Sequence, residues 1–509
     1  MKPIFRSWFR KFKARIHRRL DPNWHTGGAR PAFTARNLDY EVSHRDHAIA
    51  YGGIGAIHLL VGQLGLAEAI DRHLHVLKIH LPYHESDHVL NIVYNALCDG
   101  TCLEDIERRR TDEAFLDALG ARRIPDPTTA GDFCRRFGRS DITALLDAID
   151  EVRLGVWAEQ PDDFRDRATI DMDGTLVETS GACKAGMDIA YDGTWGYHPL
   201  ILSLAETGEV LSLVNRPGNR PSSEGAAAQV DRAVWLCLRA RFRRIVLRGD
   251  TDFSQTEHLD RWDALSEVRF VFGYNAMPNL IEIAEQLPAS DWQPLRRPPR
   301  YQVKTRPRQR PDPIKDRIVR QRQFDVLRLR SEEVAEFDYR PTACARAYRM
   351  VVVRKHISRE KGEAVLFPEV RYFFYLTNER SWTPAEAVFE ANDRCDQENL
   401  LAQLHGGVRA LAAPVNTLES NWAWMAMTAL AWTLKAWWVL LLPESPGRWH
   451  QRHRDEKRRV LGMEFKTFVN SFVLIPCQVI RTARRVVLRL LGWNPHLSTF
   501  FRLLSRLRT

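Results

Sequence analysis

The sequence has few of the features that mark a secreted or membrane-spanning protein. Its eight cysteines are scattered, without a C-x-x-C pair or a Cys/His cluster at zinc spacing, which predicts reduced thiols. Residues 1–20 are basic and aromatic and lack the apolar run and cleavage site of a secretory signal. The uncharged run from Asn421 to Leu434 has fourteen residues, fewer than the roughly 18 to 20 that cross a bilayer. We therefore expect a cytoplasmic protein with no membrane partner, in which this Trp-rich run is a buried core helix.

The composition also excludes a disordered or collagen-like chain. Hydrophobic residues make up 44% of the 509 residues, charged residues make up 27%, and the mean hydropathy is -0.36. At roughly 150 residues per domain, this length predicts about three structural units. Lys and Arg number 74 against 64 for Asp and Glu, which gives a net charge of +10. The excess of positive charge indicates a polyanionic partner, and nucleic acid is the first candidate.

The N-terminal third is predicted to be a basic arm over residues 1–47 followed by an all-α region over 48–162. Apolar residues recur there at three- and four-residue spacing, as in IGAIHLLVGQLGLAEAI and HVLNIVYNAL. In IPDPTTAGDFCRRF, Thr128 or Thr129 is the predicted N-cap of a short helix that carries Arg135 and Arg136. This helix could read DNA as the second helix of a helix-turn-helix, or its arginines could lie on an ordinary solvated face.

Residues 163–291 change to an alternation of strands and helices. RDRATIDMDGT is a β-branched run that ends in acids, and a hairpin that turns at Thr207-Gly208 follows it. A helix capped by Ser222 or Ser223, the strand RRIVLRGD, a second helix and the strand VRFVFGYN complete the series. Three strands, a helix, a strand, a helix and a strand is the order of an RNase H-like α/β core, and we predict its first part here.

Residues 292–380 are predicted to be a β-rich basic insertion in this core. Eleven of the 27 residues over 296–322 are Arg or Lys, and the prolines between them argue against a helix. Strand-like runs follow in FDVLRLR, YRMVVVRKHI and VRYFFYLTN. The basic residues are candidate DNA-phosphate contacts, Arg306, Arg308 and Arg310 among them, although a surface that only keeps the protein soluble is the alternative.

Helical periodicity returns over 381–443, the predicted second part of the core, and 444–509 is predicted to be a helical basic region. The first of these helices is expected to end at the glycine pair after His405. Arg394, Glu398 and His405 lie at i, i+4 and i+11, so they share one face of that helix. The face would present one acid between two phosphate contacts.

Two pairs of acids follow predicted strands, Asp171 with Asp173 and Asp250 with Asp252. Acids that end neighbouring strands converge at one edge of a sheet, where each carboxylate raises the pKa of the others unless a cation neutralises them. Mg²⁺ prefers such hard oxygen ligands together with phosphate oxygens. The alternative is that each acid is solvated, or that Asp252 caps the helix that begins near Ser254. Residues i and i+2 of a strand face the same way, so alternation alone does not choose between Asp171 and Asp173.

Four stretches carry a resemblance to a known family: IDMDGT, GYHPLILSLAETGEVLSLVNRPGN, LRGDTDF and RCDQEN. With them the chain resembles the DDE transposases of bacterial insertion sequences, specifically the IS-thirteen-eighty group, whose core carries a β-strand insertion before the catalytic Glu. The resemblance covers residues 48 to 443.

The resemblance implies a catalytic triad of Asp173, Asp250 and Glu398. The family's D-G-T and R-x-D-x-x-F patterns select the two aspartates. Its Tyr-x2-Arg-x3-Glu-x6-Lys signature matches at Arg394 and Glu398 only, since Ala391 replaces the Tyr and His405 the Lys. These two departures concern the phosphate contacts of the helix and leave the acid in place.

The implied activity is metal-dependent DNA cleavage and strand transfer at the inverted repeats of an insertion sequence. The triad would hold two Mg²⁺ ions, for which Mn²⁺ would substitute. The implied partners are the double-stranded DNA of the element's ends and of the target, and a second copy of the chain in a homodimer, with a nucleoid location in a bacterial cell. The alternatives are an RNase H-like nuclease without strand transfer and an inactive repressor that still binds DNA.

Overall fold

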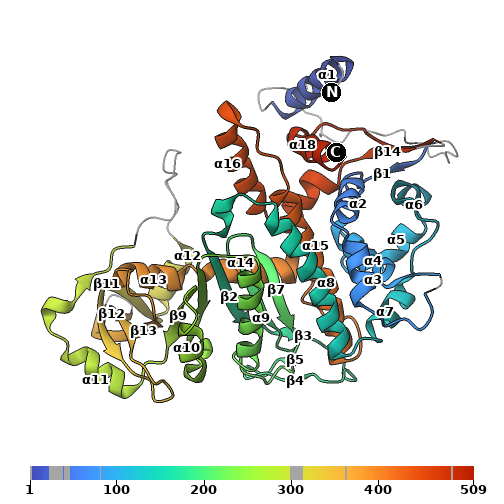
Figure 1. The fold of residues 1–509 in the computed structure, drawn as a ribbon. Coiled ribbons are helices and arrows are strands. Elements are labelled where there is room, and N and C mark those ends of the chain that lie inside the picture. The colour runs from blue at the N-terminus through green and yellow to red at the C-terminus, as the bar shows by residue number, and fades with distance from the viewer. Residues whose placement is uncertain are drawn as a thin grey trace.

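The computed structural model describes residues 3–21, 38, 46–80, 82–297, 313–361, 364–482 and 485–508. Its helical N-terminal part, its central sheet and the strands inserted into that sheet lie side by side, and the C-terminal helices lie above them (Figure 1). Arg306, Arg308 and Arg310, the predicted phosphate contacts of the insertion, lie outside the described residues.

Seven helices form the N-terminal part: α2 (Ile54–Gln63), α3 (Leu66–His73), α4 (Glu85–Leu97), α5 (Ile106–Arg110), α6 (Glu113–Leu119), α7 (Pro127–Cys134) and α8 (Arg139–Ala158). The predicted caps of α7 were wrong, because Asp126 accepts a hydrogen bond from the Thr129 N–H at 2.9 Å and Pro127 takes the first helical position. The helix ends at Cys134, so Arg135 and Arg136 follow it rather than lie on it.

The core of the central sheet contains β2 (Ala168–Gly174), β6 (Leu200–Leu204), β7 (Glu209–Val214), β8 (Ile245–Gly249) and β9 (Val268–Tyr274), in the order β7-β6-β2-β8-β9. Strands β2, β8 and β9 run parallel to one another, and β6 and β7 are antiparallel to their neighbours. Asp171 pairs with Arg248 across β2 and β8. Since parallel strands end at the same edge, this register places Asp173 and Asp250 two residues further along their respective chains, at one edge.

Helices α9 (Ala226–Arg239), α10 (Thr256–Asp263) and α11 (Pro278–Gln286) connect or follow these strands, and α9 packs on β2, β6 and β7 (Figure 1). The caps predicted at Ser222 or Ser223 were wrong: α9 begins after Gly225, whose φ of 72° is a left-handed conformation that suits glycine. A small three-stranded sheet, β3 (Val177–Glu178), β5 (Trp195–Tyr197) and β4 (Asp188–Ile189), lies between β2 and β6 in the chain.

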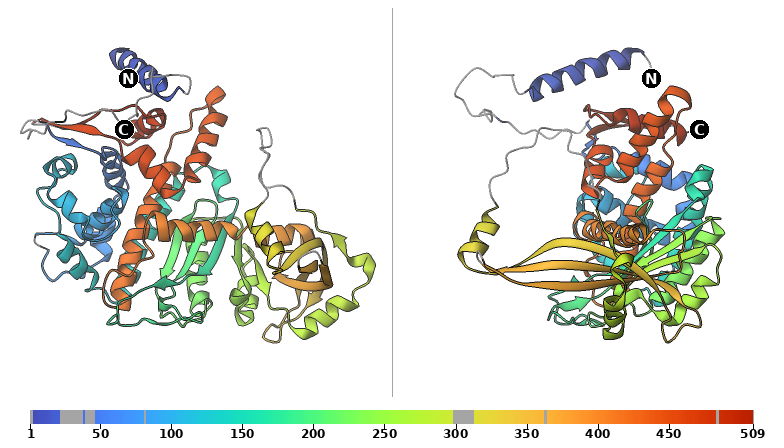
Figure 2. Two further views of the ribbon diagram at one scale, coloured as in Figure 1. Left: turned by 180° about the vertical axis from the view of Figure 1, so that it is seen from behind. Right: turned by 90° about the vertical axis from the view of Figure 1, so that its left-hand side faces the viewer.

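The strands over 292–380 continue the core sheet instead of forming a separate one. They are β10 (Gln293–Pro294), β11 (Asp325–Tyr339), β12 (Tyr348–Lys361) and β13 (Ala364–Thr377), with α12 (Ile314–Gln321) before β11. Strand β13 pairs antiparallel with β9. The sheet of nine strands that results has its three longest strands at this end, and they reach well past the rest of it (Figure 2).

The helix expected to run unbroken to His405 is interrupted. Helix α13 (Pro384–Asn392) ends before Arg394, α14 (Cys395–Ala402) begins after it, and a π-helical turn covers Gln403–Gly407. Helix α15 (Leu418–Leu440) follows, and every residue of it except Glu419 is buried. The prediction of a Trp-rich core helix is therefore confirmed.

The C-terminal part is not helical throughout, which corrects the expectation for 444–509. Between the helices α16 (His450–Leu461), α17 (Phe465–Phe468) and α18 (Leu497–Arg506), the chain forms a hairpin of β14 (Cys477–Thr482) and β15 (Arg485–Leu490). Along β14, Cys477 and Val479 are buried and Gln478 and Ile480 are partly exposed, an alternation that fits a strand with one packed face. Strand β1 (Ala48–Ile49) pairs with β14, so the region from residue 48 is also not purely helical.

Helix α1 (Pro3–Leu20) lies near the C-terminal part, with His17 against the ring of Trp493 at 5.4 Å between centroids. Within the described ranges no single helix is long and apolar enough to cross a membrane. The bent pair of α2 and α3, which meet at 59°, passes that test by length and composition only.

Candidate active site

Asp173 at the end of β2 and Asp250 just after β8 share one arginine. Arg394 Nη1 lies 3.1 Å from Asp173 Oδ2 and 3.7 Å from Asp250 Oδ2. The parallel register of β2 and β8 brings the two aspartates to one edge, and the break between α13 and α14 brings the arginine. One positive group therefore lies between two carboxylates that are far apart in the sequence.

The surroundings of Asp173 favour its protonated form. Burial, together with the negative charges of Asp250 and Glu398, raises the pKa of Asp173 to about 6, against the opposing effect of Arg394. The Gly174 N–H donates a hydrogen bond to Asp173 at 2.9 Å. Burial likewise raises the pKa of Asp250, which accepts a hydrogen bond from the Asp252 N–H at 3.0 Å. Two carboxylates that are partly buried and close to each other are stabilised by a cation between them.

Glu398 lies on α14 beside this pair. Its side chain is exposed, and its charge is close enough to raise the pKa of Asp173. Among the residues that the structure describes, however, no three His, Cys, Asp or Glu side chains are close enough to hold one metal ion. Asp173 and Asp250 thus lie together, and Glu398 is near them without closing a three-ligand cluster.

Gln397, which the sequence patterns do not single out, anchors α14 to the sheet. It is 1% exposed, its Nε2 donates to the Ile201 carbonyl at 3.3 Å, and its Oε1 accepts from the Ser203 hydroxyl. Both partners belong to β6, so Gln397 fixes the start of α14 over the core sheet and Glu398 follows directly. A polar residue with buried partners has no sequence signature, because the partners lie almost 200 positions away.

His405, the other residue of the expected helix face, lies at the end of β2. Its Nε2 is 3.1 Å from the Thr175 hydroxyl oxygen, and burial lowers the pKa of His405. The π-helical turn over Gln403–Gly407 shifts this residue relative to a regular helix. His405 therefore borders Asp173 through the D-G-T turn.

The structure distinguishes Asp171 from Asp173. Asp171 is 1% exposed and receives two hydrogen bonds from Arg248, at 2.6 and 2.8 Å. Arg248 also contacts Glu390 of α13 at 3.0 Å. Asp171 is thus a buried structural partner, whereas Asp173 reaches the edge of the sheet. Asp252 is exposed at that edge.

This difference predicts opposite effects of one substitution. Asp171→Asn leaves Arg248 without a full counter-charge in the core, and we expect a loss of about 3 to 5 kcal/mol in the free energy of unfolding.

In the wild-type protein, the pKa of Asp173 in the folded state lies above its usual 3.8, so the stability of the wild type falls as pH rises from 3.8 to about 6. Asp173→Asn removes this carboxylate and with it the loss of stability. We therefore expect Asp173→Asn to gain on the order of 1 to 2 kcal/mol at pH 7.5. Urea unfolding followed by tryptophan fluorescence measures both, and a destabilised Asp173→Asn would contradict this assignment.

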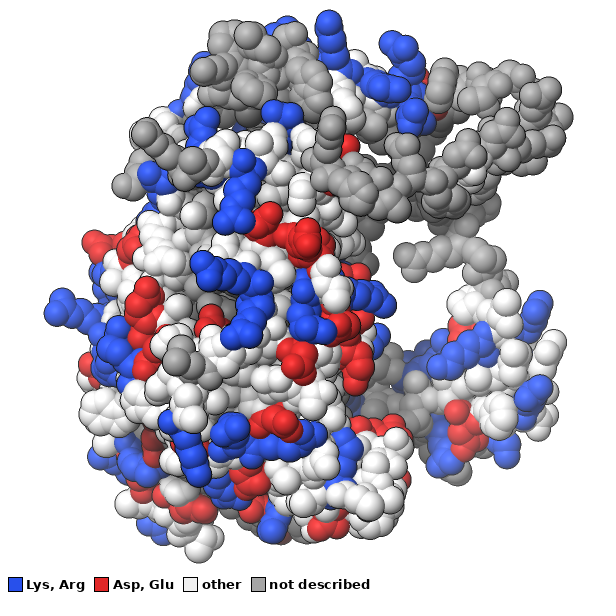
Figure 3. Space-filling view, turned by 90° about the vertical axis from the view of Figure 1, so that its right-hand side faces the viewer, with Lys and Arg blue, Asp and Glu red and all other residues white. Residues whose placement is uncertain are grey.

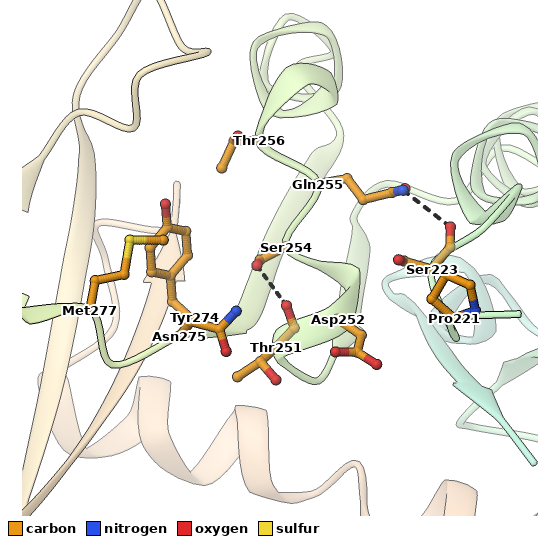
Figure 4. A pocket seen from close by; sticks show the side chains of 10 residues that line it. All are labelled: Pro221, Ser223, Thr251, Asp252, Ser254, Gln255, Thr256, Tyr274, Asn275 and Met277. Atoms are coloured by element: carbon orange, nitrogen blue, oxygen red, sulfur yellow. Dashed lines mark hydrogen bonds between the residues drawn. The ribbon is translucent and has the colours of Figure 1, made fainter. Parts of the chain in front are cut away.

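A cavity of about 340 Å³ lies among the segments that follow β8 and β9 (Figure 4). Its lining is mostly hydroxyl and amide groups, with Tyr274 and Met277 on one side. Ser223, whose carbonyl accepts from Gln255 Nε2 at 3.1 Å, lies on the other. Thr251 and Asp252, which follow Asp250 directly, also line it. The cavity therefore adjoins the candidate site on the β8 side.

The donor set fits a divalent cation. Asp173 and Asp250 offer hard carboxylate oxygens, and the Arg394 guanidinium already stands as a positive group between them. Burial, and to a lesser degree the negative charges of Asp250 and Glu398, raise the pKa of Asp173, which a cation at this place would offset. A cation at this place would replace the guanidinium as the counter-charge.

The other predicted DNA contacts lie in the all-α part. Arg135 and Arg136 are both exposed after α7, and Arg135 forms an ion pair with Asp132. On the face that Figure 3 shows, Lys and Arg side chains are interspersed with Asp and Glu, without one continuous basic patch. Arg135 and Arg136 are thus available to a partner, on a molecule whose charges are mixed.

Comparison with known proteins agrees with the sequence motifs. The family model described as "Transposase DDE domain group 1" matches residues 46–509. No curated protein matches this sequence. A solved structure, the piggyBac transposase synaptic complex with hairpin DNA, aligns with 83% of this chain and 81% of its own at 10% identity and a TM-score of 0.36, which is too low to establish a common fold. The family model, which matches nearly the whole chain, identifies this protein as a member of the DDE transposases.

Proposed function

We propose that this DDE transposase binds the terminal inverted repeats of an insertion sequence and catalyses cut-and-paste transposition. The observation that carries the proposal is the convergence of Asp173 and Asp250 on one cation, Arg394, with the charge of Glu398 nearby. These are the three acids that the family resemblance selects. The IS-thirteen-eighty group and an RNase H-like core are part of the proposal, supported by the motifs and by the order β7-β6-β2-β8-β9.

The chemistry is assigned to residues as follows. Asp173, Asp250 and Glu398 would hold two Mg²⁺ ions, or Mn²⁺ in their place, which supply Lewis-acid stabilisation of the attacking and leaving oxygens. The charges of both other acids act on Asp173, so Asp173 would be the carboxylate that helps to hold both ions. The same carboxylates would be used in both reactions. Water is the nucleophile in the hydrolytic step, and the freed DNA 3′-hydroxyl is the nucleophile in strand transfer. Arg394 and His405 contact the DNA phosphates beside them.

The remaining assignments concern DNA and a second copy of the chain. The all-α part, with Arg135 and Arg136, would recognise the element's ends, and the basic insertion would contact phosphates with Arg306, Arg308 and Arg310. Binding should weaken with salt by roughly 0.9 log units per phosphate contact for each tenfold rise. A homodimer would hold two DNA ends together for strand transfer.

Strand transfer from a pre-cut DNA end tests this function. The proposal predicts short inverted repeats in the DNA that flanks the reading frame, and duplexes of these ends are the substrate. We expect the protein with Mg²⁺ to cleave an intact end and also to join a pre-cut 3′-hydroxyl end to a target plasmid. Cleavage without joining would favour a nuclease, and binding without either reaction would favour a repressor.

A further inference from the structure

Arg394 occupies the position between the two aspartates that a metal ion needs. Its Nη1 lies 3.1 Å from Asp173 and 3.7 Å from Asp250, distances at which one guanidinium neutralises both carboxylates. Within the described part of the chain, these acids are the only side chains with which Arg394 forms a recorded ion pair or hydrogen bond. The arginine and a cation therefore compete for the same oxygens.

The position of Arg394 leaves its side chain free to exchange partners. It lies at the junction of α13 and α14, and its side chain is 22% exposed. Arg248, in contrast, is held by Asp171 and Glu390 and is 4% exposed, as expected of an arginine that is part of the core. Gln397 anchors α14 independently, so movement of the Arg394 side chain does not require the helix to move.

A DNA phosphate offers Arg394 a partner that it can bind more fully than the aspartates, which it contacts through Nη1 alone. Guanidinium binds phosphate through two parallel hydrogen bonds and keeps its charge at any physiological pH. DNA at this edge also adds negative charge to a site that already contains Asp173, Asp250 and Glu398, which increases the attraction for a divalent cation. If the Arg394 guanidinium moved from the aspartates to a DNA phosphate, Asp173 and Asp250 would become available to the metal when the DNA binds.

We propose that Arg394 is an electrostatic latch that holds Asp173 and Asp250 in the DNA-free protein and gives them up to the metal when DNA binds. The inference rests on the proposed function, because it takes these acids as the metal ligands. Its consequence is positive coupling: DNA raises the affinity for the metal, and by linkage the metal raises the affinity for DNA by the same factor. The free protein would be kept from cleaving DNA indiscriminately, since its acids are already paired.

The test is Mn²⁺ binding by the full-length protein, measured as the loss of the free-ion electron paramagnetic resonance signal. We expect a duplex that carries the inverted repeat to tighten Mn²⁺ binding by the wild-type protein at least tenfold. Arg394→Ala should bind Mn²⁺ about tenfold more tightly than wild type without DNA, and the duplex should add little. Arg394→Lys keeps the charge without the planar fork and should lie between them. Arg239→Ala, an exposed arginine near the far end of α9, removes the same charge and should behave as wild type.

The variants separate failure of the latch from failure of the proposed function. Asp173→Asn should weaken Mn²⁺ binding with and without DNA; if it does not, the metal site itself is wrong. If Asp173→Asn weakens binding while Arg394→Ala and Arg394→Lys leave DNA-free binding at the wild-type value or weaken it, the latch alone is overturned. A thermal unfolding curve for each variant identifies any that does not fold. If Arg394→Ala does not fold, the DNA-free Mn²⁺ affinity of Arg394→Lys is compared with that of the wild type instead.

Discussion

Asp173→Asn, Asp250→Asn and Glu398→Gln each lower DNA strand cleavage by at least about 10³-fold, while metal-free binding to the element's ends stays within a few-fold of wild type. Each substitution keeps the size of the side chain and removes one anionic oxygen ligand, and a thousandfold loss corresponds to about 4 kcal/mol of transition-state stabilisation. The three acids are proposed to hold the metal and not to contact DNA, so metal-free end binding is not expected to fall with cleavage. The measurements are cleavage of a labelled end duplex and fluorescence anisotropy of the same duplex.

Asp252→Asn is the matched control for this series. Asp252 lies two residues from Asp250, is exposed, and loses the same charge on substitution. Its backbone N–H, which the substitution keeps, is the group that contacts Asp250. We expect cleavage by Asp252→Asn to remain within about fivefold of wild type, a difference of about 1 kcal/mol. Equal inactivation by Asp252→Asn and Asp250→Asn, or full activity of Glu398→Gln, would contradict the assignment of the three acids.

Glu209→Ala should destabilise the fold about as strongly as Asp171→Asn. Glu209 begins β7, is fully buried, and accepts hydrogen bonds from the indole N–H groups of Trp157 and Trp437 at 2.9 and 2.8 Å. Arg153 Nε donates to it at 3.2 Å, and Thr207 donates its hydroxyl at 2.8 Å. Four donors, from α8, α15 and the turn before β7, thus converge on one carboxylate.

Removal of this carboxylate leaves the buried Arg153 with Asp150 as its remaining counter-charge. It also takes away the acceptor of the indole N–H groups of Trp157 and Trp437 in the core. We expect the free energy of unfolding to fall by about 3 to 5 kcal/mol, since a buried ion pair that loses one member costs that much. Urea unfolding is a direct measurement, because Trp157 and Trp437 report on the site by fluorescence. Glu282→Ala on the exposed side of α11 is the control and should change stability by less than about 0.5 kcal/mol. A Glu209→Ala protein as stable as the control would show that the cluster contributes little.

The sequence predicted the meeting of Asp173 and Asp250 because both follow β-branched strands, and parallel strands end at a common edge. It also predicted the buried Trp-rich helix α15, since an uncharged run of that length has no other place in a folded chain. It could not choose between Asp171 and Asp173, which point the same way along β2. The choice depends on Arg248, a residue of the neighbouring strand that binds the inner acid, Asp171, and leaves Asp173 to Arg394.

Other features depended on tertiary contacts that leave no local pattern. The break before α14 occurs at Asp393 and Arg394, both in helical backbone conformations and neither of them Gly or Pro, so no turn residue marks it. The ion pair of Arg394 with two aspartates requires chain segments more than 100 residues apart. The hairpin of β14 and β15 was expected to be helical because its arginines and apolar residues also fit a helical spacing, and pairing with β1 favours the strand.

Mapping of the metal site by iron-mediated cleavage tests the central claim most directly. Fe²⁺ bound in place of Mg²⁺ to the protein with its end duplex, treated with ascorbate and peroxide, cuts the peptide backbone next to its ligands. Three sets of cuts are predicted, after β2 near Asp173, after β8 near Asp250 and within α14 near Glu398, and all three should disappear in Asp173→Asn. Cuts near Asp173 and Asp250 with none in α14, or cuts that persist in Asp173→Asn, would contradict a metal site shared by these three acids.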